Sequence, residues 1–161
     1  MILRRFYLAL ITLFLLGIPL AQGQSPILEV TTYSDIVTDS DNTVNATDVV
    51  VFTIKAKNIS NLALSSLTIS HTLKGINGSA LTLNSSPTFF SNSNASAAGS
   101  LAAGETGTYI ATYTFNASGV SAGGISLTVT GTASPPGNSK NVIAPSDDGD
   151  DSDGNTANDP T

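Results

Sequence analysis

The sequence predicts an all-β domain, an immunoglobulin-like sandwich of about seven antiparallel strands in two sheets. Apolar side chains alternate with more polar ones along residues 48–58 and again along residues 108–115, which is typical of strands with one buried face. Turn residues recur at intervals of roughly 8 to 12 residues, as they do between short strands. Helix formers are scarce, whereas Thr, Ser, Val, Ile and Asn abound, a composition that suits strands and turns.

The two alternating stretches are expected to supply most of the core. Each carries a row of apolar side chains at every second position: Val50, Phe52, Ile54 and Ala56 in the first, and Tyr109, Ala111, Tyr113 and Phe115 in the second. We expect the rows to face each other from opposite sheets, as in other sandwiches. The order of the strands within the sheets does not follow from this periodicity.

The other elements follow in chain order. Further strands are expected at residues 27–34, 67–73, 80–83, 88–91 and 125–129, and one helical turn is expected within 117–124. Asp and Asn side chains, which bond to their own backbone, predict a loop over residues 35–47. Gly75 and Gly78 can adopt positive φ and predict the turn after the third strand. Residues 91–101 show no periodicity and are expected to form a flexible loop.

The two ends differ from the domain between them. Residues 1–23 begin with Arg4 and Arg5, continue through an apolar run and end in small residues, which predicts a secretory signal cut after Gly23 or Ala21. A retained membrane anchor is the alternative, although the run is shorter than the roughly 20 residues of a spanning helix. No later stretch is apolar enough to span a membrane.

The domain is expected to cover residues 24–133, and an acidic tail to cover residues 134–161. A Pro-Pro-Gly cluster at 135–137 opens this tail, and its later part is rich in Asp and nearly free of apolar residues. Such a segment cannot offset the entropy lost on ordering. We therefore expect the tail to be flexible and disordered.

The charge balance excludes one class of partner. The chain has 6 Lys and Arg, 12 Asp and Glu, and a formal net charge of −6. Loss of Arg4 and Arg5 with the signal changes this to −6 − 2 = −8 and leaves no arginine. A surface of this kind repels phosphate backbones, so nucleic acid is not an expected partner. With its signal and without cysteine, the protein is expected to be extracellular or at the cell surface and to lack disulfides.

A series of motifs resembles a known bacterial repeat. The motifs are the acidic turn and strand of residues 45–58, the Leu-Thr-Ile of residues 67–69, the reversal at 101–109, the Ala-Gly of 122–123 and the threonine-rich strand end at 128–131. In this order they resemble the domain of unknown function eleven and its close relatives, over residues 27–131. Thr47 stands where that family usually has glycine, and Ala103 where it usually has proline. The resemblance implies a secreted or cell-surface immunoglobulin-like module with structural or adhesive work and no catalytic residues.

Two patterns point to catalysis but lack the necessary context. Residues 119–123 fit the Gly-x-Ser-x-Gly pattern of a nucleophile elbow around Ser121, which requires a parallel sheet and a histidine later in the chain. His71, the single histidine, precedes it. One histidine without cysteine cannot assemble the usual zinc site either. We expect His71 to lie at a strand end with a local hydrogen bond, and the protein not to be an enzyme.

Calcium is the one cofactor for which the sequence gives an argument. Oxygen ligands beside turn-forming glycines gather in the tail, where they could bind calcium weakly: Asp147, Asp148, Asp150, Asp151 and Asp153. The pattern of the helix-loop-helix calcium loop fails at both of its ends, so a solvated acidic spacer is the alternative. A second carboxylate group, which could cluster at one end of the sandwich, consists of Asp35, Asp39, Asp41 and Asp48.

The function expected from these features is a non-enzymatic structural or adhesive module that binds a surface protein or a glycan. A carbohydrate-binding module is the first alternative, with Phe89 or Phe90 as a stacking ring, because the other rings look committed to the core. Self-association into a fibre is the second, through pairing of residues 27–34 with a neighbour's sheet edge. Asn-x-Ser/Thr sequons further predict outward, polar turns at Asn45, Asn58, Asn77, Asn84, Asn94 and Asn116.

Overall fold

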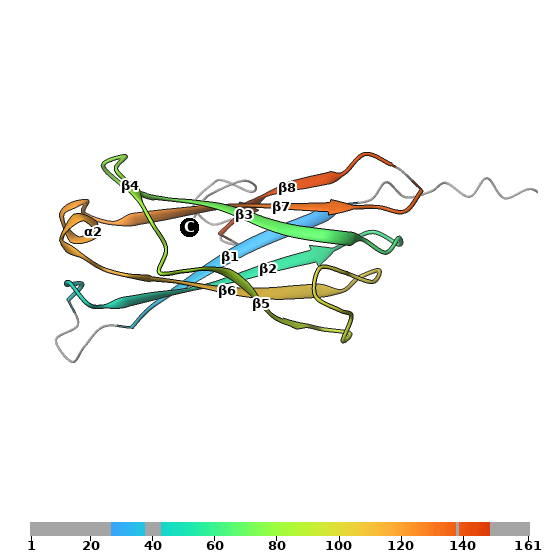
Figure 1. Ribbon diagram of the computed structural model, residues 1–161, viewed down its shortest axis with the longest axis horizontal. Helices are drawn as coiled ribbons and strands as arrows, with labels where there is room; N and C mark the ends of the chain where they lie inside the picture. The colour runs from blue at the N-terminus through green and yellow to red at the C-terminus, as the bar shows by residue number, and fades with distance from the viewer. Residues whose placement is uncertain (1–26, 38–42, 138, 149–161) are drawn as a thin grey trace, which may run out of the picture.

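The computed structural model describes residues 27–37, 43–137 and 139–148, which form an all-β domain (Figure 1). The strands are β1 (Leu28–Val37), β2 (Val49–Asn58), β3 (Ser65–Gly75), β4 (Ala80–Leu81), β5 (Ser85–Asn92), β6 (Thr106–Thr114), β7 (Ile125–Ser134) and β8 (Val142–Asp147). One short helix, α2 (Ala117–Ser121), connects β6 to β7. The all-β prediction is confirmed, and so is the helical turn.

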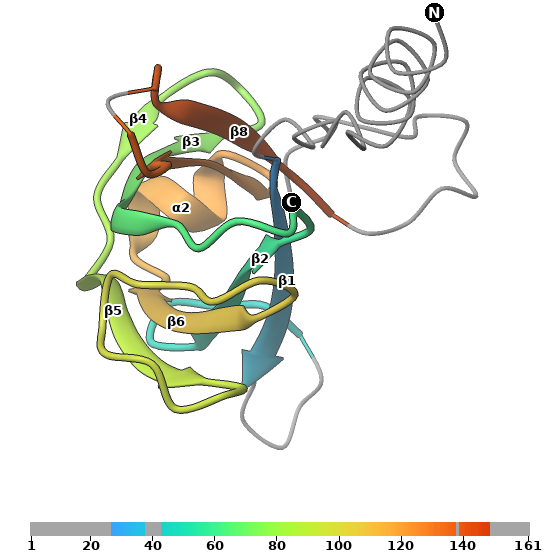
Figure 2. The same ribbon diagram turned by 90° about the vertical axis from the view of Figure 1, so that its right-hand side faces the viewer.

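The eight strands form one curled, mixed sheet in the order β4-β3-β7-β8-β1-β2-β6-β5. Neighbours are antiparallel except β1 and β8, which pair in parallel through Val30 with Ser146 and Thr31 with Asp147. The sheet curls so that its β4-β3-β7-β8 half lies over its β1-β2-β6-β5 half (Figures 1 and 2). The sequence predicted about seven strands, all antiparallel, so the parallel pair and the eighth strand are corrections to it.

The two apolar rows of the core lie side by side and do not face each other. Strand β2 pairs directly with β6, with Ile54 opposite Tyr109 and Val50 opposite Tyr113. Residues opposite each other in an antiparallel pair point to the same face, so both rows line one wall of the core. Alternation reveals which face of a strand is buried but not which strand lies beside it, and the prediction of facing rows was wrong for that reason.

The other half of the sheet supplies the opposite wall. Buried apolar side chains of β3 and β7 belong to the same hydrophobic cluster: Leu67, Leu73, Leu127, Val129 and Ala133. Gly131 of β7 belongs to this wall as well, because a Cβ there would press against Val30 and Leu28 of β1. The core is therefore closed between β3 and β7 on one side and β1, β2 and β6 on the other.

Strand β8 corrects the predicted start of the tail at residue 134. The chain turns at Gly137, which has a φ of +77°, and returns as β8 between β7 and β1. Ala144 and Ser146 are buried there, and the Val129 amide donates to the Ser146 hydroxyl at 3.0 Å. The breaker cluster at 135–137 ends one strand, but a second short strand follows it, in which the buried residues Ala144 and Ser146 alternate with more exposed ones.

The predicted signal at residues 1–23 and the acidic residues 149–161 lie outside the described residues. Within the described part of the chain, no helix has the length and apolar character required to cross a membrane.

Candidate functional site

The structure does not bring Ser121 and His71 together. Ser121 is the last residue of α2, at the end of the sheet. His71 lies within β3, opposite Val129 of β7, and is exposed. The expectation that His71 ends a strand is therefore corrected, since β3 continues to Gly75.

The carboxylates predicted for calcium are only partly described. Asp147 ends β8 and Asp148 follows it, whereas Asp150, Asp151 and Asp153 lie outside the described residues. Within the described ranges, no three or more His, Cys, Asp or Glu side chains gather closely enough to hold a metal ion. Calcium binding by the tail remains a prediction.

The second carboxylate group is described only at Asp35 and Asp48, because Asp39 and Asp41 fall outside the described ranges. Asp48 is 4% exposed and accepts the Asn45 amide at 2.9 Å. This bond closes the turn that leads into β2. The carboxylate of Asp48 thus shapes the backbone at this end of the sheet.

The aromatic residues divide as the sequence predicts. Tyr109, Tyr113 and Phe115 are buried, whereas Phe90 on β5 is 71% exposed. Phe89 is 39% exposed and packs edge-on against Tyr109, with ring centroids 5.8 Å apart. Among the described residues, Phe90 is therefore the most exposed aromatic residue, ahead of Tyr33 at 44%.

Asn58 has a structural role that its sequon did not indicate. Its side chain is fully buried, and its amide nitrogen donates to the carbonyls of Leu62, Leu101 and Ala102 at 2.7, 3.2 and 3.0 Å. Its carbonyl oxygen accepts from the Ser60 amide at 3.1 Å and from the Ser60 hydroxyl at 2.7 Å. Asn58 thus ties the β2–β3 loop to the β5–β6 loop, and the prediction that it points outward was wrong.

Glu105 organises the loop that was expected to be flexible. The carboxylate has no exposed surface and accepts from the Asn94 and Ser96 amides at 3.0 and 3.2 Å, from the Ser96 hydroxyl at 2.6 Å and from the Ala102 amide at 2.6 Å. The Ser96 hydroxyl, followed by these amides, lowers the pKa of Glu105 although burial acts in the opposite direction. The aperiodic sequence of residues 91–101 gave no sign of this arrangement.

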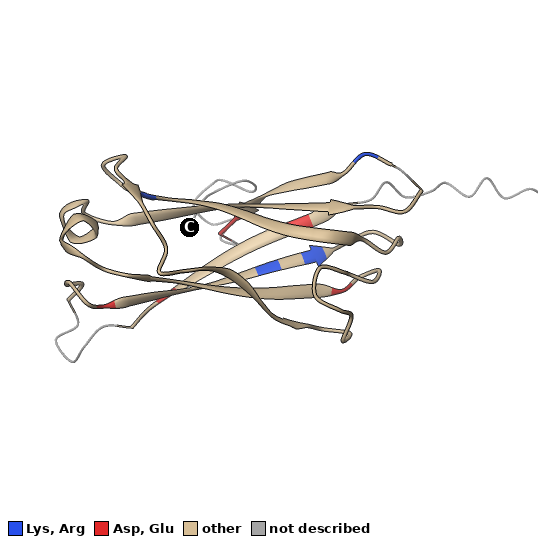
Figure 3. Ribbon diagram, in the orientation of Figure 1, with Lys and Arg blue, Asp and Glu red and all other residues tan. Residues whose placement is uncertain are grey.

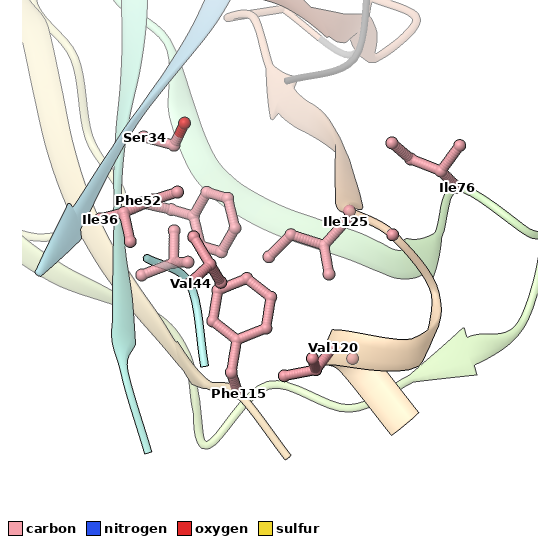
Figure 4. A pocket seen from close by; sticks show the side chains of 12 residues that line it. Ser34, Ile36, Val44, Phe52, Ile76, Phe115, Val120 and Ile125 are labelled. Carbon is pink, nitrogen blue, oxygen red and sulfur yellow. The ribbon is translucent and has the colours of Figure 1, made fainter. Parts of the chain in front are cut away.

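An apolar cavity at the opposite end of the sheet, here called the end pocket, is a candidate site for ligand binding (Figure 4). Its volume is about 380 Å³. It opens where β1 and β7 diverge beyond β8, which pairs with β1 only at residues 30 and 31. The lining side chains come from β1, the turn before β2, β2 itself, the β3–β4 turn and the segment around α2.

The end pocket has a buried floor and an exposed rim. Val50, Phe52 and Phe115 form the floor and are at most 5% exposed. Large aliphatic side chains that are 40–72% exposed surround the opening: Ile36, Val44, Ile76 and Val120. Solvent can therefore reach the cavity past four apolar side chains.

Helix α2 is fixed against the pocket by its own sequence. Asn116 caps the helix, since its side chain accepts the Gly119 amide at 2.9 Å. Gly119 allows the helix to lie close to the core, because a Cβ at this position would overlap the Tyr113 hydroxyl. Tyr113 in turn packs edge-on against Phe115, with centroids 5.4 Å apart. The cap at Asn116 and the contact of Gly119 with Tyr113 thus hold α2 in place as a wall of the end pocket.

Charged residues are few on the described strands (Figure 3). Among the described residues that line the end pocket, none is charged. Of the lining residues that the structure describes, Ser34 alone has a polar side chain, and the others are aliphatic, aromatic or glycine. On β2, Lys55 lies 5.0 Å from the centroid of the Tyr33 ring. The pocket thus offers apolar contacts and one hydroxyl, and no charge to neutralise an ion.

Comparison of the chain with models of known protein families, with curated proteins and with solved structures gives no match.

Proposed function

We propose that the protein is a non-enzymatic structural or adhesive module, secreted or held at the cell surface, with an immunoglobulin-like fold of the bacterial repeat type described above. The pairing of β1 with β8 carries this proposal. The polar side chains that are fully buried at the loops, Asn58 and Glu105, are engaged in holding the backbone. Such use of buried polar groups favours a rigid unit over a reactive site.

The geometry of the two terminal strands suits a unit that bears tension. The chain enters the sheet at the amino end of β1 and leaves it at the carboxyl end of β8, and these strands are parallel neighbours. Force applied through the two ends of the chain therefore slides β1 along its neighbours. Many hydrogen bonds must then break together, including those between β1 and its ten partner residues from Asn58 to Val49 on β2.

Single-molecule force measurements with two pairs of attachment points test the proposal. The chain has no cysteine, so introduced cysteines provide unique handles. Handles at Ile27→Cys and Asp148→Cys load the sheet by sliding. Handles at Ile27→Cys and Ile59→Cys lie at one end of the β1–β2 pair, where the Ile59 amide donates to the Ile27 carbonyl at 3.2 Å, and they open the pair one bond at a time.

We expect the unfolding force to be at least twofold higher for the first pair of handles than for the second. The shared Ile27 handle makes the comparison a matched one, and melting curves of both variants check that their stabilities agree. Equal forces in the two geometries would contradict a load-bearing role.

A glycan-binding role is a second candidate, which the exposure of Phe90 favours. Its ring is 71% exposed on the edge strand β5, where it could stack on the flat face of a sugar. Consistent binding on a glycan array that is lost in Phe90→Ala would support this role. The matched control is Ile76→Ala, whose side chain is equally exposed, 72%, but lies at the end pocket.

Fibre assembly through residues 27–34 receives less support. These residues begin β1, which pairs with β2 along its whole length and with β8 at Val30 and Thr31. At Val30 and Thr31, where both edges of β1 are paired, a neighbour would have to displace β2 or β8. Sedimentation of the dilute protein, with calcium or with a chelator, tests this role. Weak calcium binding by the acidic tail is tested separately by calorimetric titration of the protein with calcium.

A further inference from the structure

We propose that the end pocket binds an uncharged apolar molecule, such as an alcohol with a long alkyl chain. This inference goes beyond the structural role proposed above and does not depend on it. Three features carry it: the volume of the cavity, the composition of its lining and the absence of charge among its lining residues (Figure 4).

The end pocket is large enough to hold a small molecule. It is open to solvent at its rim, and its volume is about 380 Å³. That volume falls within the range of known small-molecule pockets, about 300–1,000 Å³. Its floor of Phe52 and Phe115 is continuous with the main core, so a ligand would extend the core outward.

The lining determines the class of ligand. Water in the cavity finds few side-chain partners among the described lining residues, because only Ser34 of these has a polar side chain. Displacing this water by an alkyl chain or ring is favourable in proportion to the apolar area covered. The four aliphatic side chains at the rim would lose exposed surface at the same time, and the Ser34 hydroxyl can hydrogen-bond with one oxygen of the ligand.

Charge excludes an anionic amphiphile such as a fatty acid. No lysine lines the end pocket, and the whole chain has a net charge of −6. A carboxylate brought to the rim would lose hydration without gaining a partner.

A fluorescent probe provides the test. N-phenyl-1-naphthylamine is uncharged and becomes bright in apolar surroundings, so titration into the purified full chain measures binding. We expect saturable binding of one probe per chain. Decanol should displace the probe, and decanoate at pH 8, which has the same chain length and a negative charge, should require at least a tenfold higher concentration.

Two matched variants locate the site. Val120→Trp fills the end pocket from α2 and should weaken probe binding at least tenfold. Ile143→Trp adds the same ring on β8, where Ile143 is 67% exposed and does not line the pocket, and should leave binding unchanged. If circular dichroism shows that Val120→Trp is unfolded, Ser34→Phe replaces it. That variant narrows the same opening from β1 and should weaken probe binding in the same way.

The proposal is overturned if the probe fails to saturate, if both tryptophan variants bind it equally, or if decanoate competes as well as decanol. It is also overturned if the protein dimerises with the rim of the pocket at the interface, which would appear as a concentration-dependent mass that Ile76→Asp reduces to that of a monomer. These readouts are independent of the force measurements, so failure of one proposal does not imply failure of the other.

Discussion

Replacement of Asn58 by alanine should destabilise the domain more than any exposed substitution. The side chain lies at the end of β2, is fully buried and makes five hydrogen bonds to two loops. Alanine removes all five and leaves buried carbonyl and amide groups without partners. Three of these bonds lie in fully buried surroundings: those to the Leu101 carbonyl, the Ser60 amide and the Ser60 hydroxyl.

The magnitude follows from those three buried bonds. A buried polar group that loses its partner costs about 1–3 kcal/mol, and the other two bonds, to Leu62 and Ala102, are only partly buried, so water can replace them. Taking about 1 kcal/mol for each buried bond gives a loss of about 3 kcal/mol in the free energy of unfolding. For a domain of this size, that corresponds to a fall of roughly 12 °C in the melting temperature.

Urea and thermal unfolding, followed by far-ultraviolet circular dichroism, measure this loss. Asn77→Ala is the matched control, because Asn77 accepts one amide, that of Ser79 at 3.0 Å, in an exposed turn. That variant should stay within about 0.5 kcal/mol of the wild type.

A second variant separates hydrogen bonding from packing. Asn58→Asp keeps the size of the side chain and one acceptor oxygen, but it replaces the donating amide with an oxygen that faces the three carbonyls. It should be at least as destabilising at pH 7 as Asn58→Ala. If Asn58→Asp is neutral, or if Asn58→Ala costs less than about 1 kcal/mol, the hydrogen bonds of Asn58 do not hold the loops as argued.

Three further predictions concern Glu105, Gly119 and Ser146. Hydrogen bonds lower the folded pKa of Glu105 below 4.5. Its carboxylate therefore stabilises the fold above that pH, and this contribution is lost as the pH falls through the folded pKa. In urea titrations, Glu105→Gln should be less stable than the wild type at pH 7 and should lose less stability on acidification. Gly119→Ala should cost about 1–3 kcal/mol, since its Cβ would overlap the Tyr113 hydroxyl. Ser146→Ala should cost about 1–3 kcal/mol by leaving the Val129 amide without its acceptor.

Matched exposed positions control these three measurements. Glu29→Gln, Ser118→Ala and Ser139→Ala change exposed side chains of the same kinds and should each stay within about 0.5 kcal/mol of the wild type. A Glu105→Gln variant with an unchanged pH profile would contradict the first prediction. A neutral Gly119→Ala would mean that α2 can move away from the core, and a neutral Ser146→Ala would mean that β8 adds little to the sheet.

The sequence predicted most of the strands because alternation is a local property. Residues 49–58 form β2 as their alternation predicts, and their inward face is the one that carries Phe52. The neighbours of a strand cannot be predicted from alternation. Nothing in the sequences of β2 and β6 shows that Ile54 would lie opposite Tyr109. Pairing of this kind depends on the whole topology.

The buried polar residues were missed for a related reason. Asn58 and Glu105 resemble ordinary turn residues in the sequence, and their partners lie up to 44 residues away. Strand β8 was missed because the breaker cluster at 135–137 marks the end of one element without excluding another after it. The end pocket arises from five separate segments, so no local pattern could have indicated it.

The parallel contact between β1 and β8 also affects when the domain can fold. Among the described strands, the first, β1, takes its place beside the last, β8, so the sheet cannot close before β8 has been made. Pairings that span most of the chain are slow to form, and until residue 147 is available the β1 edge and the core remain open. A chain with this topology therefore completes its sheet only after the last of its described strands, β8, has been made.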